Sequence, residues 1–387
     1  MVYYGVCDSM NTLLPLGKLL EYEQPSKYIV ESTDYNDSYR TPVLTAGKTF
    51  ILGYTNEQDG IYNNLPVIIF DDFTTASKYV NFPFKVKSSA MKILKPNLDL
   101  VDPKYIYYRM QIINIDHSTH KRYWIQQYSK IKISIPTLPE QKRIVARIEE
   151  LFSNLDSTVE TLQKTKQQLE VYRQAVLREA FEKTKGYNKN TINNICSNIV
   201  DCPHSTPKWV SQGELCLRTT NFKRGYLDLS EKNYVSKDTF NSRNTRLVPM
   251  PGDVLYSREG AILGIACIIP EQTYVCLGQR MMLLRTNSLM NNRFLMYYLN
   301  SPIITDYVQT ITGGSASPHV NVKDIKNISI PVPDIKTQKE IVLFIEQKFS
   351  ICDKLSSYIE VSLQQAEAMR QSILKQAFEG GLYEKIE

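Results

Sequence analysis

A long stretch with helix-forming composition occurs twice in this chain of 387 residues, and that repeat limits the folds open to it. Residues 140–185 and 334–379 contain neither proline nor glycine, and each run follows a proline and is followed by a glycine. These are the residues that commonly start and stop helices. Aligned at an offset of 197, the 42 positions beginning at Gln141 and Gln338 include 18 identities. The sequence therefore predicts two related long helices.

The apolar residues of both runs recur at steps of three, four or seven, the spacing of a seam that faces another helix. A helix of 42 residues would be about 63 Å long and needs a partner along most of its course. Because the runs are equally long, each copy is the simplest partner for the other. Periodicity leaves parallel and antiparallel pairing open, but modules at opposite ends favour the antiparallel one. The predicted seam consists of Ile148, Leu155, Val159, Leu162, Leu169, Tyr172, Val176, Ile345, Phe349, Cys352, Ile359, Leu363, Ala366 and Ile373.

Each helical run follows a segment that is rich in predicted strands. Alternating or continuous apolar runs predict strands at 65–70 and 82–86 in the first segment, and at 252–256 and 261–269 in the second. Each segment also opens with a similar short stretch (16–20 and 192–196) and has a short helical stretch late in its length (103–108 and 293–298). Between these landmarks the two segments look unlike one another.

The predicted fold class is α+β, with two strand-rich modules that are each followed by a long helix, in a pseudo-two-fold repeat. The predicted divisions are a first module at 1–136, a central helix at 137–186, a second module at 187–332 and a C-terminal helix at 333–387.

The net charge of +6 lies outside the helical runs, which together carry fifteen Lys or Arg and fifteen Asp or Glu. Basic modules on a neutral frame are typical of proteins that bind an anionic polymer. Tyrosine is abundant at 25 residues, and its ring and hydroxyl suit bases and phosphates, although strand tyrosines account for most of them.

Seven cysteines are scattered along the chain without a CxxC pair, which favours reduced thiols in a cytoplasmic protein over a disulfide framework or a zinc site. No stretch reaches the length of about 18 to 20 apolar residues that a membrane span needs. The N-terminal residues lack the pattern of an export signal. We therefore expect a cytoplasmic chain with no membrane contact.

Four short patterns resemble catalytic or ligand-binding motifs but match them incompletely. Residues 46–49 (AGKT) resemble the end of a phosphate-binding loop, yet Pro42 stands where the pattern needs glycine. Residues 81–84 (NFPF) resemble the tetrapeptide of an adenine methyltransferase without its second proline, and a strand is the better interpretation. His117 and His120 lack a nearby third ligand, and the acidic pair at 71–72 lacks the partners of a nuclease site. We expect no catalytic residue and no metal site.

The entry to the first helix, 135–145 (IPTLPEQKRIV), is similar to the "IPLPPLxEQKRIV" segment of type I restriction-modification specificity subunits. It recurs as 330–333 (IPVP) followed by Gln338 and Lys339. The second module adds further family-like segments at 201–207, 251–255 and 313–315. The first module has no counterpart of the Gly-Asp-Val-Leu segment and resembles a different subtype of target recognition domain. The resemblance covers nearly the whole chain.

This resemblance implies two target recognition domains, each of which reads one half of a split site in double-stranded DNA. It implies that the helices form an antiparallel coiled coil that sets the distance between the half-sites. It also implies two modification subunits as partners, which bring S-adenosylmethionine and methylate adenine, and restriction subunits that carry the motor and nuclease. No cofactor is expected in this chain.

Candidate DNA-binding residues are the polar and aromatic side chains of predicted loops, since Arg and Lys pair with guanine, Asn and Gln with adenine, and Lys, Ser and Thr with phosphates. In the first module they are Lys27, Tyr28, Thr45, Lys48, Tyr54, Asn56, Lys78, Tyr79, Lys121, Arg122 and Tyr123. In the second they are His204, Ser205, Thr206, Lys208, Arg218, Asn221, Lys223, Arg224, Arg243, Asn244, Arg246, Arg258, Gln279, Arg280, Ser315 and His319.

Two other functions remain open on the residues alone. A coiled-coil scaffold that binds only proteins would show no salt-dependent DNA binding in its assembled complex. A free-standing methyltransferase or nuclease would be active without partners, which the failed motif matches argue against.

Overall fold

The structure is a computed structural model that describes residues 12–47, 49–115, 122–313 and 318–379. The chain divides into two compact units. Unit 1 comprises 1–162 and 361–387, and unit 2 comprises 163–360. Each unit therefore contains one module together with half of each long helix, a division that differs from the four consecutive segments predicted above.

The first module lies wholly in unit 1, and its central sheet has the strand order β2-β8-β5-β6. A smaller sheet has the order β4-β3-β7, and β1 pairs with β9. The elements are β1 (Thr12–Pro15), α1 (Leu16–Leu19), β2 (Leu20–Glu23), η1 (Pro25–Tyr28), β3 (Thr41–Leu44), β4 (Ile51–Thr55), β5 (Val67–Asp71), β6 (Ser77–Val80), β7 (Lys85–Val86), β8 (Met91–Pro96), α2 (Pro103–Met110), α3 (Tyr123–Gln126), η2 (Tyr128–Lys130) and β9 (Lys132–Ile135).

The second module lies wholly in unit 2 and repeats the topology of the central sheet. Its central sheet has the order β11-β20-β17-β18, a second sheet has the order β12-β16-β13-β19, and β10 pairs with β21. Its elements are β10 (Lys189–Thr191), α5 (Ile192–Ile195), β11 (Cys196–Asp201), β12 (Trp209–Val210), β13 (Glu214–Leu217), η3 (Thr219–Asn221), β14 (Phe222–Lys223), β15 (Tyr226–Leu227), β16 (Tyr234–Val235), α6 (Lys237–Arg243), β17 (Val254–Ser257), β18 (Ala266–Ile268), β19 (Cys276–Leu277), β20 (Met281–Thr286), α7 (Asn292–Leu299), α8 (Pro302–Ile311), α9 (Val322–Lys326) and β21 (Ser329–Pro331).

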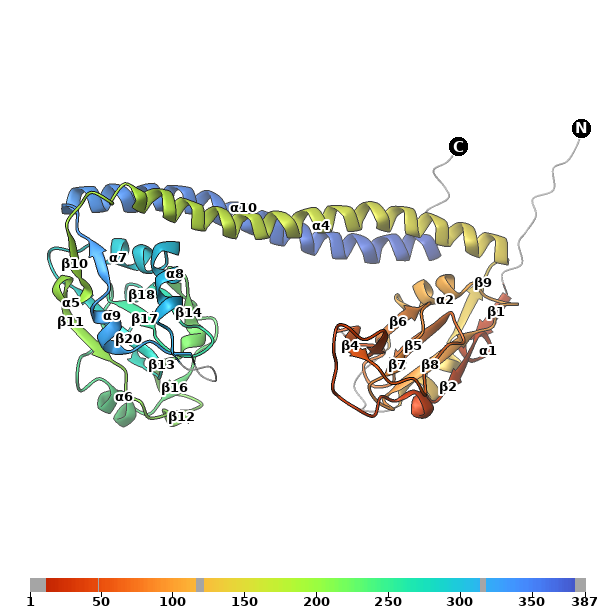
Figure 1. The fold of residues 1–387 in the computed structure, drawn as a ribbon. Coiled ribbons are helices and arrows are strands. Elements are labelled where there is room, and N and C mark those ends of the chain that lie inside the picture. The colour runs from red at the N-terminus through yellow and green to blue at the C-terminus, as the bar shows by residue number, and fades with distance from the viewer. Residues whose placement is uncertain (1–11, 48, 116–121, 314–317, 380–387) are drawn as a thin grey trace, which may run out of the picture. The chain divides into compact units, whose positions relative to one another are not determined.

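The central strands are continuously apolar because both faces of each sheet are covered. In β5, Ile68 and Phe70 join the cluster on the helix side of the sheet, whereas Val67 and Ile69 join the cluster on the other side. Strands β17 and β20 divide their side chains between two clusters in the same way. In Figure 1, α2 in unit 1 and α7 in unit 2 lie between the central sheet and the long helices.

The long helices are α4 (Leu138–Glu182) and α10 (Ile335–Phe378), close to the predicted bounds. Within unit 2 they run antiparallel, since Lys166 Nζ lies 3.1 Å from Glu360 Oε1 and Arg173 Nη2 lies 2.6 Å from Asp353 Oδ1. Within unit 1 the matching ion pair joins Arg370 to Asp156. These arginine–aspartate pairs are equivalent under the repeat, and the antiparallel pairing is confirmed.

The predicted seam residues are buried or half-buried on these helices with one exception. Tyr172 is 45 % exposed and does not belong to the seam. The helix ends carry further buried residues that the seam pattern omits, because there the helices pack on a module as well as on each other. Phe181 packs edge-on against Phe294 and Tyr298 in unit 2, and Phe378 packs edge-on against Tyr105 in unit 1.

The first helical turns are joined to their modules by a buried glutamine in each unit. Gln141 and Gln338 are both fully buried. Gln141 Nε2 donates to the carbonyls of Leu100 and Pro136, at 3.1 and 2.9 Å, and Oε1 accepts from the amide of Asp102 at 2.8 Å. One side chain thereby forms hydrogen bonds with two backbone carbonyls and one backbone amide of the module and linker.

Gln338 repeats the arrangement with the carbonyls of Leu289 and Pro333, at 2.9 and 2.8 Å, and the amide of Asn291 at 2.7 Å. The glutamine of the repeated Gln-Lys segment is therefore a structural clamp. Asp102 and Asn291 each cap the following helix, so α2 and α7 are equivalent with Lys104 matching Arg293. The helical stretches predicted at 103–108 and 293–298 begin 190 residues apart, one more than the 189 that separate Asp102 and Asn291.

Two predicted strands are shorter than expected. The strand predicted at 82–86 is formed only by β7, and the one predicted at 261–269 only by β18. Gly260 and Gly264 have φ values of 87° and 83°, in the left-handed region that favours glycine. The Leu263 amide donates to the Gly260 carbonyl at 3.1 Å, so the chain turns here before the strand begins.

Six of the seven cysteines lie in the described part of the chain, and all six are buried thiols. Burial raises the pKa of the Cys196 thiol to about 12 and also raises the pKa of the Cys267 thiol. A thiol must lose its proton to react with an alkylating reagent.

In a Cys7→Ser variant we therefore expect the remaining six thiols to react with an aromatic disulfide reagent at least about a hundredfold more slowly in the native protein than in urea. The urea-unfolded sample gives the reference rate. Rapid labelling of any of these thiols in native protein would show that its core opens locally.

Candidate nucleic-acid interface

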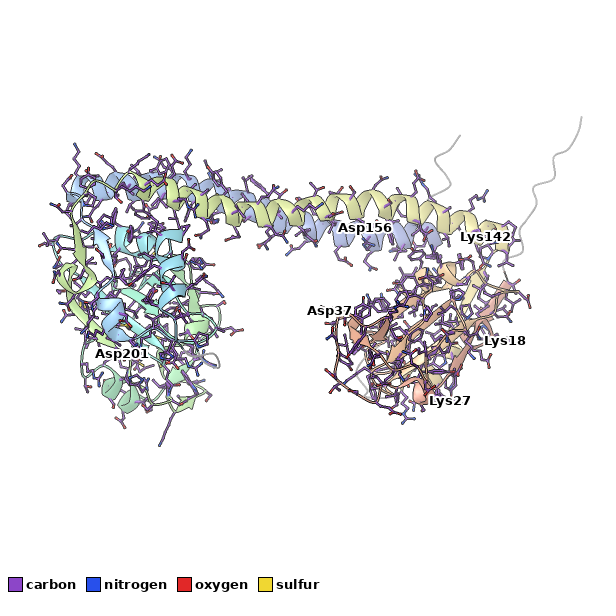
Figure 2. The ribbon with its side chains drawn as sticks, in the orientation of Figure 1. Lys18, Lys27, Asp37, Lys142, Asp156 and Asp201 are labelled. Atoms are coloured by element: carbon purple, nitrogen blue, oxygen red, sulfur yellow. The ribbon has the colours of Figure 1, made fainter. Side chains whose placement is uncertain are left out.

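Several of the predicted DNA-binding residues lie at one end of the central sheet in unit 2, where neighbouring strands end or begin. Strand β20 pairs antiparallel with both β11 and β17, so the ends of β11 and β17 meet the start of β20. This brings together Asp201, Arg258 and Arg280. Figure 2 shows Asp201, the last residue of β11, in the part of unit 2 that lies away from α4 and α10. We call this end of the sheet, where β11 and β17 end and β20 begins, together with the loops that follow and precede these strands, the strand edge.

A buried ion pair lies at the centre of the strand edge. Arg258 donates to both oxygens of Asp201, from Nε at 2.8 Å and from Nη2 at 3.1 Å, and only 8 % of its side chain is exposed. His204 Nε2 lies 3.2 Å from Asp201 Oδ2, and its side chain is 73 % exposed. Asp201 therefore holds an arginine inside the module and a histidine at its surface.

Arg280 stands at the strand edge as an exposed cation on a strained backbone. Its φ is 68°, which a side chain of L configuration rarely adopts. Its carbonyl accepts from the Arg258 amide at 3.0 Å, and its Nε lies 3.6 Å from Glu259 Oε1. Strained, exposed side chains of this kind are common at binding sites.

Two loops at the strand edge are tied to one another. Gln279 donates from Nε2 to the carbonyl of His204 and accepts from Thr206 Oγ1 at 3.4 Å. Ser205 and Lys208 are exposed in the first of these loops. His319, half-buried, forms an isolated β-bridge with Glu259, the residue after Arg258. His204, Ser205, Thr206, Gln279, Arg280 and His319 therefore lie in neighbouring loops, as a common binding surface requires.

A second group of predicted residues lies beside the long helices. Lys223 and Arg224 are exposed on the β14–β15 hairpin, where Gly225 has a φ of 99°. They line a cleft of about 840 Å³ that is bounded on its other side by α4 and α10, within unit 2. Arg224 Nη1 donates to the Asn300 carbonyl at 3.4 Å.

Four of the predicted DNA-binding residues are buried in unit 2, and their side chains bond within the protein: Asn221, Arg243, Asn244 and Arg258. Asn221 accepts from the Arg218 amide at 2.8 Å and donates to the carbonyls of Asp228 and Glu231, both at 3.0 Å. Polarity alone predicted them to be exposed, but backbone groups replace water as the partners of three of these side chains, and the Asp201 carboxylate does so for Arg258. Their positions fit the support of loops rather than direct contact with a ligand.

The remaining predicted cations of unit 2 are exposed. Arg246 Nη1 donates to the Asp201 carbonyl at 3.5 Å, which places it next to the strand edge. Arg218 lies over the ring of Trp209, 5.6 Å from its centroid. Trp209 is 39 % exposed and was not predicted, because a lone tryptophan gives no positional signal.

Unit 1 has an equivalent edge with different residues. Gln24 follows β2 as Asp201 ends β11, and Asp72 follows β5 as Arg258 follows β17. Lys92 joins them, with Nζ 3.1 Å from Gln24 Oε1 and 3.6 Å from Asp72 Oδ2. The side chains of Lys92 and Asp72 are only 3 % and 2 % exposed. Asp72 stood out in the sequence only as part of an acidic pair, and Gln24 and Lys92 did not stand out at all, since only strand register reveals that the three meet.

The predicted residues of unit 1 are more dispersed. Lys27, Asn56 and Arg122 are exposed, whereas Tyr28, Thr45, Tyr54, Lys78 and Tyr79 are half-buried and Tyr123 is buried. The amides of Tyr123 and Trp124 bond to the carbonyl and the carboxylate of Asp72, so Arg122 lies near the edge. Lys78 lines a cleft of about 790 Å³ beside α4 and α10.

Lys48, Lys121, Ser315, His117 and His120 lie outside the described residues. Within the described ranges, no group of three or more His, Cys, Asp or Glu side chains is arranged to hold a metal ion. In the same part of the chain, none of the helices combines the length and the apolar character of a membrane span.

Two modules share one topology, carry different polar residues on the same sheet edge, and are mounted on repeated helices that pair antiparallel. These features define a two-module binding protein in which each module can read a different surface. A family model described as the type I restriction modification DNA specificity domain matches residues 12–171 and again 208–365. The chain belongs to this family.

Relatives and solved structures agree with this assignment. The chain is 32 % identical over 378 residues to the Type I restriction enzyme EcoR124I/EcoR124II specificity subunit of Escherichia coli, covering 92 % of each. It is 21 % identical over 360 residues to the MjaVIII specificity subunit of Methanocaldococcus jannaschii, covering 84 % of this chain and 82 % of that one. A chain from a structure of the type I R-M system, described for its assembly and conformational transition, matches 98 % of this chain with a TM-score of 0.68 at 18 % identity. That likeness concerns the fold.

Proposed function

We propose that this chain is the DNA-reading specificity subunit of a type I restriction-modification enzyme and performs no catalysis itself. The observation that carries the proposal is that the specificity-domain family matches the chain twice. The two modules have central sheets of the same topology but different residues at the equivalent sheet ends. Equal topology lets both modules be mounted in the same way on the repeated helices. Unlike edges let each module, 1–136 and 187–332, read its own half of a split site in double-stranded DNA.

The partners follow from the same assignment. Two modification subunits would dock on this subunit and supply S-adenosylmethionine, and restriction subunits would join them in the cytoplasm. No cofactor is assigned to this chain. In unit 2, we assign direct contact with DNA to the exposed residues of the strand edge. Arg280 is the strongest candidate, because its strained backbone presents an exposed guanidinium beside Glu259. In unit 1, we assign contact to the exposed residues near the equivalent edge, such as Arg122.

The alternative is a scaffold that binds only proteins. A scaffold has no need for two modules whose sheet edges differ, so this function is less well supported. The two functions separate in one experiment, because the scaffold predicts that the assembled complex binds DNA without sequence preference or salt dependence.

The test is to assemble the chain with its cognate modification subunits and methylate a DNA library that varies both half-sites and the gap. We expect methylation of one split sequence. In that complex, Arg280→Ala should lower methylation about 10- to 100-fold through one half-site, which corresponds to losing one bidentate base contact.

Lys189→Ala is the matched control, since it removes one exposed positive charge from β10 in the same module. It should leave the preferred sequence and the rate within about twofold. Methylation of an unsplit sequence would contradict the proposal, and so would equal effects of the two substitutions.

A further inference from the structure

The buried arginine at the end of α6 has an unusual set of partners. Arg243 is 8 % exposed, and its side chain donates hydrogen bonds to four backbone carbonyls. Nε donates to Leu277 at 2.6 Å and Nη2 to Gly278 at 2.8 Å. The same guanidinium donates to Ser205 at 3.1 Å and to Pro203 at 3.3 Å. One side chain thus joins two segments that are more than 70 residues apart in the sequence.

The two segments that Arg243 joins are the loops that carry exposed polar residues of the strand edge. Pro203 and Ser205 flank His204 in the first loop, and Leu277 and Gly278 precede Gln279 and Arg280 in the second. A planar guanidinium offers five donors in a fixed geometry and so fixes the relative position of several carbonyls.

The second loop has a conformation that the local sequence does not favour. A Cβ atom at Gly278 would lie 2.2 Å from the Leu217 carbonyl oxygen, so this position accepts only glycine, and Arg280 two residues later is left-handed. A strained turn keeps its shape only when surrounding contacts determine it. Two sets of contacts determine this turn. Arg243 binds the carbonyls of Leu277 and Gly278 at the start of the turn, and the Arg258 amide donates to the Arg280 carbonyl at its end.

We propose that Arg243 is a positioning residue for sequence discrimination: it holds the 203–206 and 277–280 loops in one arrangement before DNA arrives. The inference rests on the proposed function and deepens it. It distinguishes two kinds of residue. Arg243 acts on specificity from inside the module, whereas residues such as Arg280 touch DNA. Preorganised contacts discriminate better, because a wrong base cannot be accommodated by moving the loops.

The test is Arg243→Lys in the complete complex with modification subunits. Lysine keeps the charge, but one ammonium cannot satisfy four carbonyls in this geometry. The measured quantity is discrimination, the ratio of methylation rates on the preferred site and on sites with one base changed. We expect discrimination to fall at least tenfold at one half-site, with the other half-site and complex assembly unchanged.

Arg285→Lys is the matched control. Arg285 lies in β20, where it binds Asp253 at 2.8 Å through Nε and the Val248 carbonyl at 2.9 Å. Its side chain makes three hydrogen bonds, against four for Arg243, and none of the three goes to either loop. Arg285→Lys should lower thermal stability while both half-sites keep their discrimination. Equal losses of discrimination in the two variants, or full discrimination in Arg243→Lys, would overturn the proposal.

A measurement on the unaltered complex covers the case in which Arg243→Lys does not fold. Peptides that span 202–207 and 276–281 should exchange their amide hydrogens slowly before DNA is added, with little further slowing in its presence. Fast exchange that becomes slow only with DNA would show that DNA orders the loops, and would refute the role of Arg243. Absence of any split-site preference in the unaltered complex would refute the proposed function instead.

Discussion

Asp201→Ala is expected to lower the free energy of unfolding of unit 2 by about 3 kcal/mol, because it leaves a buried guanidinium without its counter-ion. The Arg258 side chain is 8 % exposed and loses both carboxylate contacts, at 2.8 and 3.1 Å. Surface ion pairs are worth only about 0.2–1 kcal/mol, so burial is what makes this effect large.

The measurement is urea denaturation followed by tryptophan fluorescence. The chain has two tryptophans, Trp124 in unit 1 and Trp209 in unit 2. In a Trp124→Phe background, Trp209 reports on unit 2. Placing Asp201→Ala in that background isolates the unit in which the ion pair lies.

The matched control replaces both partners with apolar residues, Asp201→Leu together with Arg258→Met. Apolar side chains of similar size often match or exceed the stability of a buried ion pair. We expect the double variant to recover to within about 1 kcal/mol of the wild type. A single variant that costs under about 1 kcal/mol, or a double variant less stable than the single one, would show that water screens the pair.

The long helices could be predicted closely because their signal is local. An uninterrupted run of helix-forming residues with three- and four-residue apolar spacing needs no knowledge of the rest of the chain. The error at Tyr172 shows the limit of this signal. Its position continues the apolar spacing, but the side chain is 45 % exposed, because burial depends on which face meets the other helix.

A pseudo-two-fold repeat could be predicted from the residues, but the strand pairing that the two modules share could not. Equivalent positions are 176 residues apart at Leu16 and Ile192 but 189 apart at Asp102 and Asn291, because the connecting loops differ in length. No single offset aligns them, and the Gly-Asp segment that precedes β17 is Leu-Pro before β5. Strand pairing, which is non-local, establishes the equivalence.

The structure brings some of the predicted site residues together and places others inside the module. His204, Gln279 and Arg280 do meet at the strand edge, but Arg243 and Asn221 are inside the module. Residue type says that a side chain needs hydrogen-bond partners. Whether water, a carbonyl or DNA supplies them depends on packing around the side chain.

Gln141→Leu and Gln338→Leu are each expected to lower the free energy of unfolding by about 3 kcal/mol, in unit 1 and unit 2 respectively. Leucine fills the space of glutamine but leaves one amide and two carbonyls without partners at a buried site. Each buried unsatisfied group costs about 1–3 kcal/mol, and the added apolar burial offsets only part of the total.

Trp124 fluorescence reports on Gln141→Leu, and Trp209 fluorescence on Gln338→Leu, in urea denaturation of the matching single-tryptophan backgrounds. Gln168→Leu on the exposed surface of α4 is the control and should change stability by less than about 0.5 kcal/mol. The repeat also predicts how the two variants compare. Because both glutamines have the same three kinds of partner, the two losses of unfolding free energy should agree within about 1 kcal/mol. A large loss for one glutamine and none for the other would show that the clamp is not a property of the repeat.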